Sequence, residues 1–167
     1  MIDSAAFVSY LEKRFQFISG VPCTYFKKML IYLAEHETEL QLQHVIATRE
    51  DEAMGIASGV VFSGKQAVVY MQNSGLGNVG DALTSLAQLY KLPMLLLISY
   101  RGLESDRAFP EHDIMGDVNE AVLKAFNIPY WNLSISNWEE EMDIAIEEMK
   151  KSSAPVALLV KDGVLSQ

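Results

Sequence analysis

The stretch from 44 to 78 decides the fold, and it reads HVIATREDEAMGIASGVVFSGKQAVVYMQNSGLGN. Its first residues, His44 to Ala47, form a short apolar run, and Gln66 to Met71 form a second one. Between them lies a longer segment, Glu50 to Ser63, with the length and composition of a helix. A strand, a helix and a strand in this order predict a parallel βαβ unit.

The same alternation extends along the whole chain. Short apolar runs predict six strands, over 15–19, 44–47, 66–71, 94–100, 129–133 and 156–160. Longer amphipathic runs predict helices over 4–14, 24–37, 50–63, 78–90, 116–126 and 138–150. Continuous apolar strands joined by helical crossovers are typical of sheets that are covered on both faces. We therefore expect a single α/β domain, 1–167, with an open six-stranded parallel sheet and helices on both faces.

Composition and charge exclude several classes of protein. The formal net charge of −9 argues against a nucleic-acid or anionic-membrane partner, because both kinds of partner require a cationic surface. The longest apolar runs, such as Leu92 to Ile98, are far shorter than the roughly 20 residues that span a bilayer, and the N-terminus lacks a cationic, apolar signal sequence. A single cysteine, Cys23, cannot form an internal disulfide. We expect a cytoplasmic protein.

Polar residues follow two of the predicted strands. The acidic triplet Glu50 to Glu52 opens the helix after the first of them, and Gln72, Asn73, Ser74 and Asn78 follow the next. Ligands of open parallel sheets bind beyond the carboxyl ends of the strands, so these residues predict a site. Helix caps at the same positions are the alternative, because carboxylates and amides there also satisfy free backbone N–H groups.

The helix after the triplet contains two glycines, Gly55 and Gly59. Each costs roughly 1 kcal/mol against alanine in a helix interior. Two such residues indicate that another backbone approaches this helix closely.

Glycines 75, 77 and 80 fit the pattern of a dinucleotide-binding loop, which suggests a nicotinamide enzyme as an alternative. That loop normally follows the first strand of its unit, and an acidic residue should end the next strand to bind the ribose. Tyr100 and Arg101 occupy that place here, so we reject this alternative.

Taken together, the motifs resemble the pyrimidine-binding domain of thiamine-diphosphate enzymes. Within that superfamily the chain is similar to sulfopyruvate and phosphonopyruvate decarboxylases, and most of all to the alpha subunit of the two-subunit sulfopyruvate decarboxylase. The likeness covers about 15–161, and four segments carry it: Gly20-Val21-Pro22-Cys23, Thr48-Arg49-Glu50-Asp51-Glu52-Ala53 with Gly59, Gln72-Asn73-Ser74-Gly75-Leu76-Gly77-Asn78, and Ser99-Tyr100-Arg101-Gly102.

The resemblance implies that Glu50 is the acid that hydrogen-bonds the aminopyrimidine ring of thiamine diphosphate. Protonation of that ring nitrogen makes the exocyclic amine a stronger acid, and its imino form can then remove the thiazolium proton. For this role Glu50 should be shielded from water, because desolvation favours the neutral, proton-donating carboxyl. Gln72, Asn73 and Asn78 are expected to bind the cofactor.

Family members hold the diphosphate through Mg²⁺ on a separate domain that carries a Gly-Asp-Gly motif, and this motif does not occur in the present sequence. The resemblance therefore implies that the diphosphate-binding domain lies on a separate beta subunit, which also holds the Mg²⁺. The chain should be inactive without this partner. We expect a hetero-oligomer with at least two copies of each chain.

The segment from 101 to 115 holds the remaining candidates. Arg101 and Arg107 present the paired donors that suit a sulfonate or phosphonate. A surface ion pair with Glu104 or Asp106 is an equally good account of Arg101 and a better one of Arg107. His112 lies where related decarboxylases carry a histidine, and it is a candidate catalytic proton relay; the alternative is a histidine that only hydrogen-bonds within its loop.

The predicted activity is decarboxylation of 3-sulfopyruvate to sulfoacetaldehyde and CO₂. Phosphonopyruvate is the alternative substrate, because both anions require cationic, bidentate recognition. An alternative of another class is a non-catalytic regulatory domain with the same fold.

Overall fold

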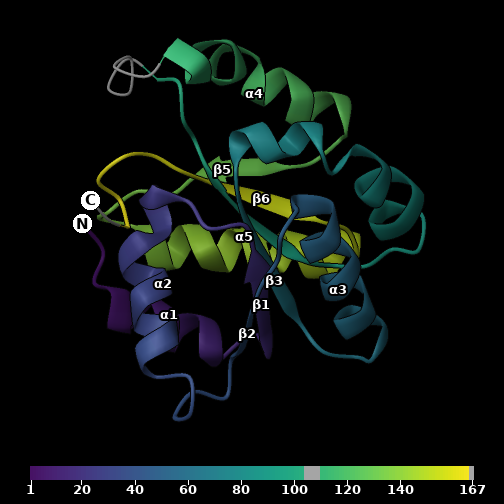
Figure 1. Cartoon of the computed structure of the whole chain (residues 1–167). Coiled ribbons are helices and arrows are strands. Elements are labelled where there is room, and N and C mark those ends of the chain that lie inside the picture. The colour runs from purple at the N-terminus through teal and green to yellow at the C-terminus, as the bar shows by residue number, and fades with distance from the viewer. Residues whose placement is uncertain (104–109, 166–167) are drawn as a thin grey trace.

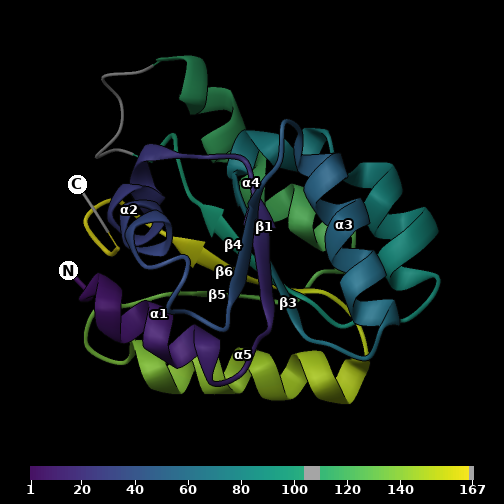
Figure 2. The same cartoon turned by 60° about the horizontal axis from the view of Figure 1, so that its bottom comes forward.

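The computed structural model describes residues 1–103 and 110–165. Within them, six strands form one sheet with the order β2-β1-β3-β4-β6-β5, and every neighbouring pair is parallel. Figure 1 shows the whole chain, and in Figure 2 the arrowheads of β4 and β6 point the same way. The predicted α/β class, with its open parallel sheet, is confirmed.

The observed elements match the predicted runs with shifted ends. The strands are β1 (Phe17–Gly20), β2 (Gln43–Ile46), β3 (Ala67–Gln72), β4 (Leu95–Ser99), β5 (Tyr130–Asn132) and β6 (Val156–Val160). The α-helices are α1 (Ser4–Glu12), α2 (Lys27–Glu35), α3 (Glu50–Phe62), α4 (Asp113–Ala125) and α5 (Trp138–Ser152). Short 3-10 helices are η1 (Thr24–Phe26), η2 (Asn73–Gly77) and η5 (Pro110–His112), and η3 (Ala82–Gln88) is a π-helix.

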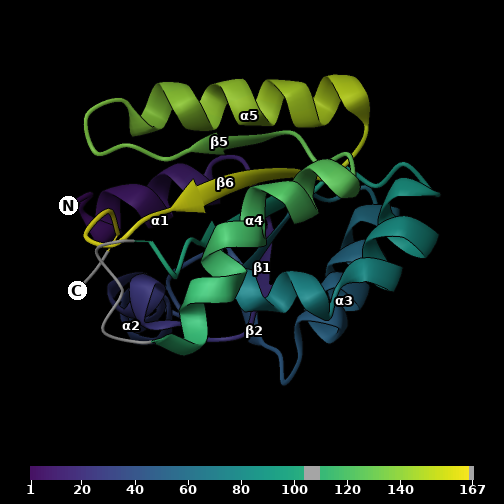
Figure 3. The same cartoon turned by 90° about the horizontal axis from the view of Figure 1, so that it is seen from above.

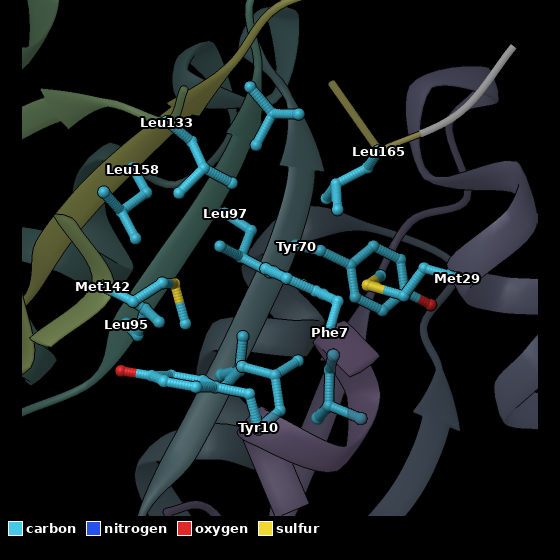
Figure 4. Packing of buried hydrophobic residues seen from close by; sticks show 14 of the residues in the cluster. Phe7, Tyr10, Met29, Tyr70, Leu95, Leu97, Leu133, Met142, Leu158 and Leu165 are labelled. Atoms are coloured by element: carbon cyan, nitrogen blue, oxygen red, sulfur yellow. The ribbon is translucent and has the colours of Figure 1, made fainter. Parts of the chain in front are cut away.

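The sheet separates two hydrophobic cores. Successive residues of a strand point to opposite faces, so Val68 and Tyr70 of β3 join one core while Val69 and Met71 join the other. Helices α1, α2 and α5 cover the first core and α3, η3 and α4 the second; Figure 3 shows α5 and α3 on opposite sides of the strands. Figure 4 shows the first core, with Phe7 and Tyr70 among its labelled side chains. Burial on both faces explains why β1, β3, β4 and β6 read as continuous apolar runs, whereas the edge strands β2 and β5 are only partly buried.

Gly20 ends β1 at a place where the backbone and ring of Tyr70 leave no room for a side chain. It pairs in register with Tyr70 of β3, and a Cβ at position 20 would lie 1.9 Å from the Tyr70 carbonyl oxygen. No side chain fits in that space.

Two predicted helices are confirmed, but part of each has a different helical form. The run 24–37 begins with the 3-10 turn η1 before α2, and the run 78–90 contains the π-helix η3. In η3 the Thr84 hydroxyl donates to the carbonyl oxygen of Gly80 at 2.9 Å, the oxygen that the Thr84 amide would use in an α-helix. Ser58 makes the same kind of bond to Met54 inside α3, which is α-helical, so this bond alone does not account for the wider helix. Apolar periodicity does not distinguish the two helix types.

In the part of the chain that the structure describes, no helix has both the length and the apolar character that crossing a bilayer requires.

Candidate active site

Helix α3 begins at the carboxyl end of β2, and the three acids of its first turn have different surroundings. Asp51 accepts two hydrogen bonds from the Arg49 guanidinium, at 3.0 and 3.2 Å, and this interaction lowers the pKa of its carboxyl. The Glu52 carboxylate accepts hydrogen bonds from the amide and the hydroxyl of Thr48, both at 2.7 Å. The bond from the hydroxyl is the main cause of the lowered pKa of the Glu52 carboxyl, and the bond from the amide adds to it. Both serve the start of the helix, as expected for solvated residues there.

Glu50 instead extends toward η2, which follows β3, the strand on the far side of β1 from β2. Its Oε2 accepts a hydrogen bond from Asn78 Nδ2 at 2.8 Å. Its aliphatic part lies against Gly75, where a Cβ would come within 2.5 Å of Glu50 Cγ. The side chain is half-buried in the single chain, so complete shielding stays a prediction for an assembly.

Asn73 is fully buried, and its Nδ2 donates to the main-chain oxygen of Arg101 at 2.9 Å. This bond connects the end of β3 with the segment after β4. The buried Asn73 Oδ1 has no hydrogen-bond partner among the described residues. The structure thus gives Asn73 a scaffolding contact, and its predicted contact with a cofactor remains untested.

Arg101 lies against the segment that follows β1. Its Nη2 donates to Thr24 Oγ1 at 2.5 Å, and its guanidinium lies 4.4 Å from the centre of the Tyr25 ring. These contacts give the guanidinium one orientation. An ion pair with a neighbouring acid, the alternative that the sequence left open, would involve residues outside the described ranges.

Three further polar groups gather at the same strand ends. Gln72 and Ser99 pair in register on β3 and β4, and the Ser99 hydroxyl is fully buried. The Cys23 thiol shares a hydrogen bond with Ser99 Oγ at 3.1 Å, and Gln72 Nε2 donates to Ser74 Oγ at 3.0 Å. Ser99 lies in one of the segments that carry the resemblance, but the sequence gave it no role in the site, because a serine at the end of a buried strand also suits an ordinary core position.

The predicted histidine lies beside this site on another element. His112 ends the short turn η5, directly before α4, and its carbonyl oxygen faces Gly102, which has φ +82°. Helix α4 in turn packs against η2. Arg107 lies outside the described residues.

The donors and acceptors of the site suit a polar heteroaromatic ring. Glu50 uses Oε2 for Asn78, which leaves Oε1 for a ring nitrogen, and Gly75 keeps side-chain bulk away from the carboxyl. Carboxyl and amide groups can complement both the nitrogen and the amino group of an aminopyrimidine. Across 1–103 and 110–165, no group of three or more His, Cys, Asp or Glu residues is placed to hold a metal ion.

Comparisons with known proteins agree with this chemistry. The family model described as thiamine pyrophosphate enzyme, N-terminal TPP binding domain, matches residues 4–120. Sulfopyruvate decarboxylase subunit alpha of Methanocaldococcus jannaschii is 35% identical over 149 residues, which cover 89% of this chain and 86% of the relative. The same subunit of Methanococcus maripaludis is 34% identical over 130 residues, covering 78% and 75%.

A more distant relative is phosphonopyruvate decarboxylase of Streptomyces viridochromogenes. It is 28% identical over 153 residues, covering 89% of this chain but only 37% of the relative. Among solved structures, 2-oxoglutarate:ferredoxin oxidoreductase from Magnetococcus marinus superposes with a TM-score of 0.65 at 18% identity, over 98% of this chain and 29% of that one. The structural likeness establishes the fold alone.

Proposed function

The chain belongs to the thiamine pyrophosphate enzyme family, and from this premise we propose that it is the pyrimidine-binding alpha subunit of a decarboxylase that converts 3-sulfopyruvate to sulfoacetaldehyde and CO₂. One observation carries the proposal. In a chain that aligns with sulfopyruvate decarboxylase alpha subunits over most of their length, the carboxyl of Glu50 is held at the strand ends with one oxygen left for a ligand.

In this proposal Glu50 holds a proton at the pyrimidine ring of thiamine diphosphate. The bound cofactor supplies the electron sink that decarboxylation of a 2-keto acid requires. Gln72, Asn73 and Asn78 are proposed to line the cofactor site, Arg101 to bind the anionic end of the substrate, and His112 to move a proton at the reacting carbon.

We assign the diphosphate and its Mg²⁺ to a partner subunit. Support comes from the names of the relatives, which are alpha subunits. Activity then requires both chains, in an assembly with at least two copies of each.

The proposed interface with the partner includes the outer face of α3. Gly55 and Gly59 are exposed there, and a Cβ at either position would meet nothing within 4 Å. Packing within the chain therefore does not explain these glycines. Beside them lie Phe62 and Tyr90, which are both 58% exposed and whose rings contact each other at 5.7 Å. An apolar surface with two bare backbone positions suits close packing against another chain.

Gly59→Leu should weaken assembly of the two subunits by about 10- to 100-fold, which corresponds to an overpacking cost of roughly 1–3 kcal/mol. The fold should survive, because position 59 has open space around it within the chain. Sedimentation of the mixed subunits measures the effect. Ala121→Leu, which adds bulk to the exposed side of α4, is the matched control. Unchanged assembly of Gly59→Leu would place α3 outside the interface.

The substrate is tested with the reconstituted pair of subunits. We expect carbon dioxide release from 3-sulfopyruvate, with a higher kcat/KM than from phosphonopyruvate or pyruvate. A preference for phosphonopyruvate would reassign the substrate within the same chemistry. Turnover of pyruvate at an equal rate would remove the anion-binding role of Arg101.

A further inference from the structure

Asn78 and Gly75 belong to one short segment, and both contact the side chain of Glu50. These contacts indicate how the carboxyl is oriented. We propose that Asn78 is a positioning residue that acts on Glu50 rather than on the cofactor, with Gly75 as the surface against which the Glu50 side chain rests. The inference rests on the proposed function, and it assigns Asn78 a role other than the direct cofactor contact that the sequence suggested.

The hydrogen bond fixes which carboxyl oxygen remains available. An amide nitrogen is a donor only, so Asn78 Nδ2 requires an acceptor at Oε2, which lies 2.8 Å away. A donated hydrogen bond disfavours protonation of the oxygen that accepts it. The proton of the neutral acid is therefore held on Oε1. That is the oxygen left for the ring nitrogen of the cofactor.

Gly75 fixes the position of the same side chain from another direction. A Cβ at position 75 would lie 2.5 Å from Glu50 Cγ and 2.9 Å from both Cδ and Oε1. The buried glycine therefore lets the carboxyl approach η2 closely enough to reach Asn78. Because proton transfer depends on donor placement within about 0.5 Å, a contact on each side of the carboxyl is a means of holding that placement.

The decisive experiment uses the reconstituted two-subunit enzyme with Asn78→Ala and the isosteric Asn78→Asp. Three quantities are measured: kcat and KM for the substrate, the dissociation constant of thiamine diphosphate, and the rate at which the thiazolium C2 proton of the bound cofactor exchanges with deuterium. Asn132→Asp, at an exposed asparagine on β5, is the matched control.

Asn78→Ala should lower both kcat and the exchange rate by about tenfold, with KM and cofactor affinity within about twofold. Asn78→Asp should lower both rates further, because an aspartate accepts where the asparagine donates and would draw the Glu50 proton to Oε2, away from the ring nitrogen. Asn78→Gln, which keeps an amide donor, should retain more exchange activity than Asn78→Ala. Gly75→Ala should slow exchange as well, because its methyl group displaces Glu50.

Two results would overturn the inference. Exchange at the wild-type rate in both Asn78→Ala and Asn78→Asp would remove the positioning role. Weaker cofactor binding with normal exchange in the bound state would instead make Asn78 a direct cofactor ligand. If the Asn78 variants exchange normally but Glu50→Gln abolishes exchange, the positioning role fails while the proposed function stands. Full activity of Glu50→Gln would sink the proposed function itself.

Discussion

Glu50→Gln should lower the kcat of the reconstituted decarboxylase by about 100- to 10,000-fold, the range over which a positioned acid or base contributes to a reaction. Glutamine keeps the shape of the side chain and can still accept from Asn78, but it has no acidic proton to share with the pyrimidine ring. The fold and the assembly with the partner should be unchanged. Steady-state decarboxylation of 3-sulfopyruvate measures the loss.

The matched control is Glu52→Gln, two residues further along α3. Glu52 is exposed and accepts from Thr48, so its substitution should change kcat by less than about twofold while slightly weakening the start of the helix. If Glu50→Gln and Glu52→Gln were equally active, Glu50 would have no role in the chemistry. The regulatory-domain alternative would then account better for this fold.

Gly20→Ala should destabilise the chain by about 3 kcal/mol or more, at the upper end of the cost of overpacking a core. Its methyl group would lie 1.9 Å from the carbonyl oxygen of Tyr70 and within 2.7 Å of the Tyr70 ring. The Tyr70 carbonyl belongs to a central strand, so β1 and β3 would have to separate. Urea unfolding followed by circular dichroism measures the free energy of unfolding.

Gly77→Ala is the control for Gly20→Ala, because a Cβ at position 77 meets nothing within 4 Å. It should change the free energy of unfolding by less than about 1 kcal/mol. If Gly20→Ala were as stable as this control, the carbonyl and ring of Tyr70 would not restrict position 20.

The fold was predictable because the sheet is buried on both faces. A short, continuous apolar run such as Val156–Val160 is typical of a strand covered on both sides, and that strand was predicted with its observed ends. The π-helical form of η3 was not predictable from the apolar pattern. Periodicity reports which side of a helix is apolar and not which carbonyl each amide selects.

The site was predictable in its members but not in its contacts. Glu50 and Asn78 were both candidates, yet the hydrogen bond between them depends on the register of β1 between β2 and β3, which no local pattern contains. Ser99 was missed because a small polar residue at the end of a buried strand resembles an ordinary core position.

The hydrogen bond from Asn73 reaches the main-chain oxygen of residue 101 and does not involve the side chain there. Any amino acid at 101 would present the same carbonyl, so the attachment of this segment to η2 is independent of the side chain that we propose to bind the substrate. A lineage could therefore exchange the arginine for a group suited to a different keto acid without rebuilding the architecture around it. In this arrangement, substrate preference is free to evolve while the cofactor machinery stays constant.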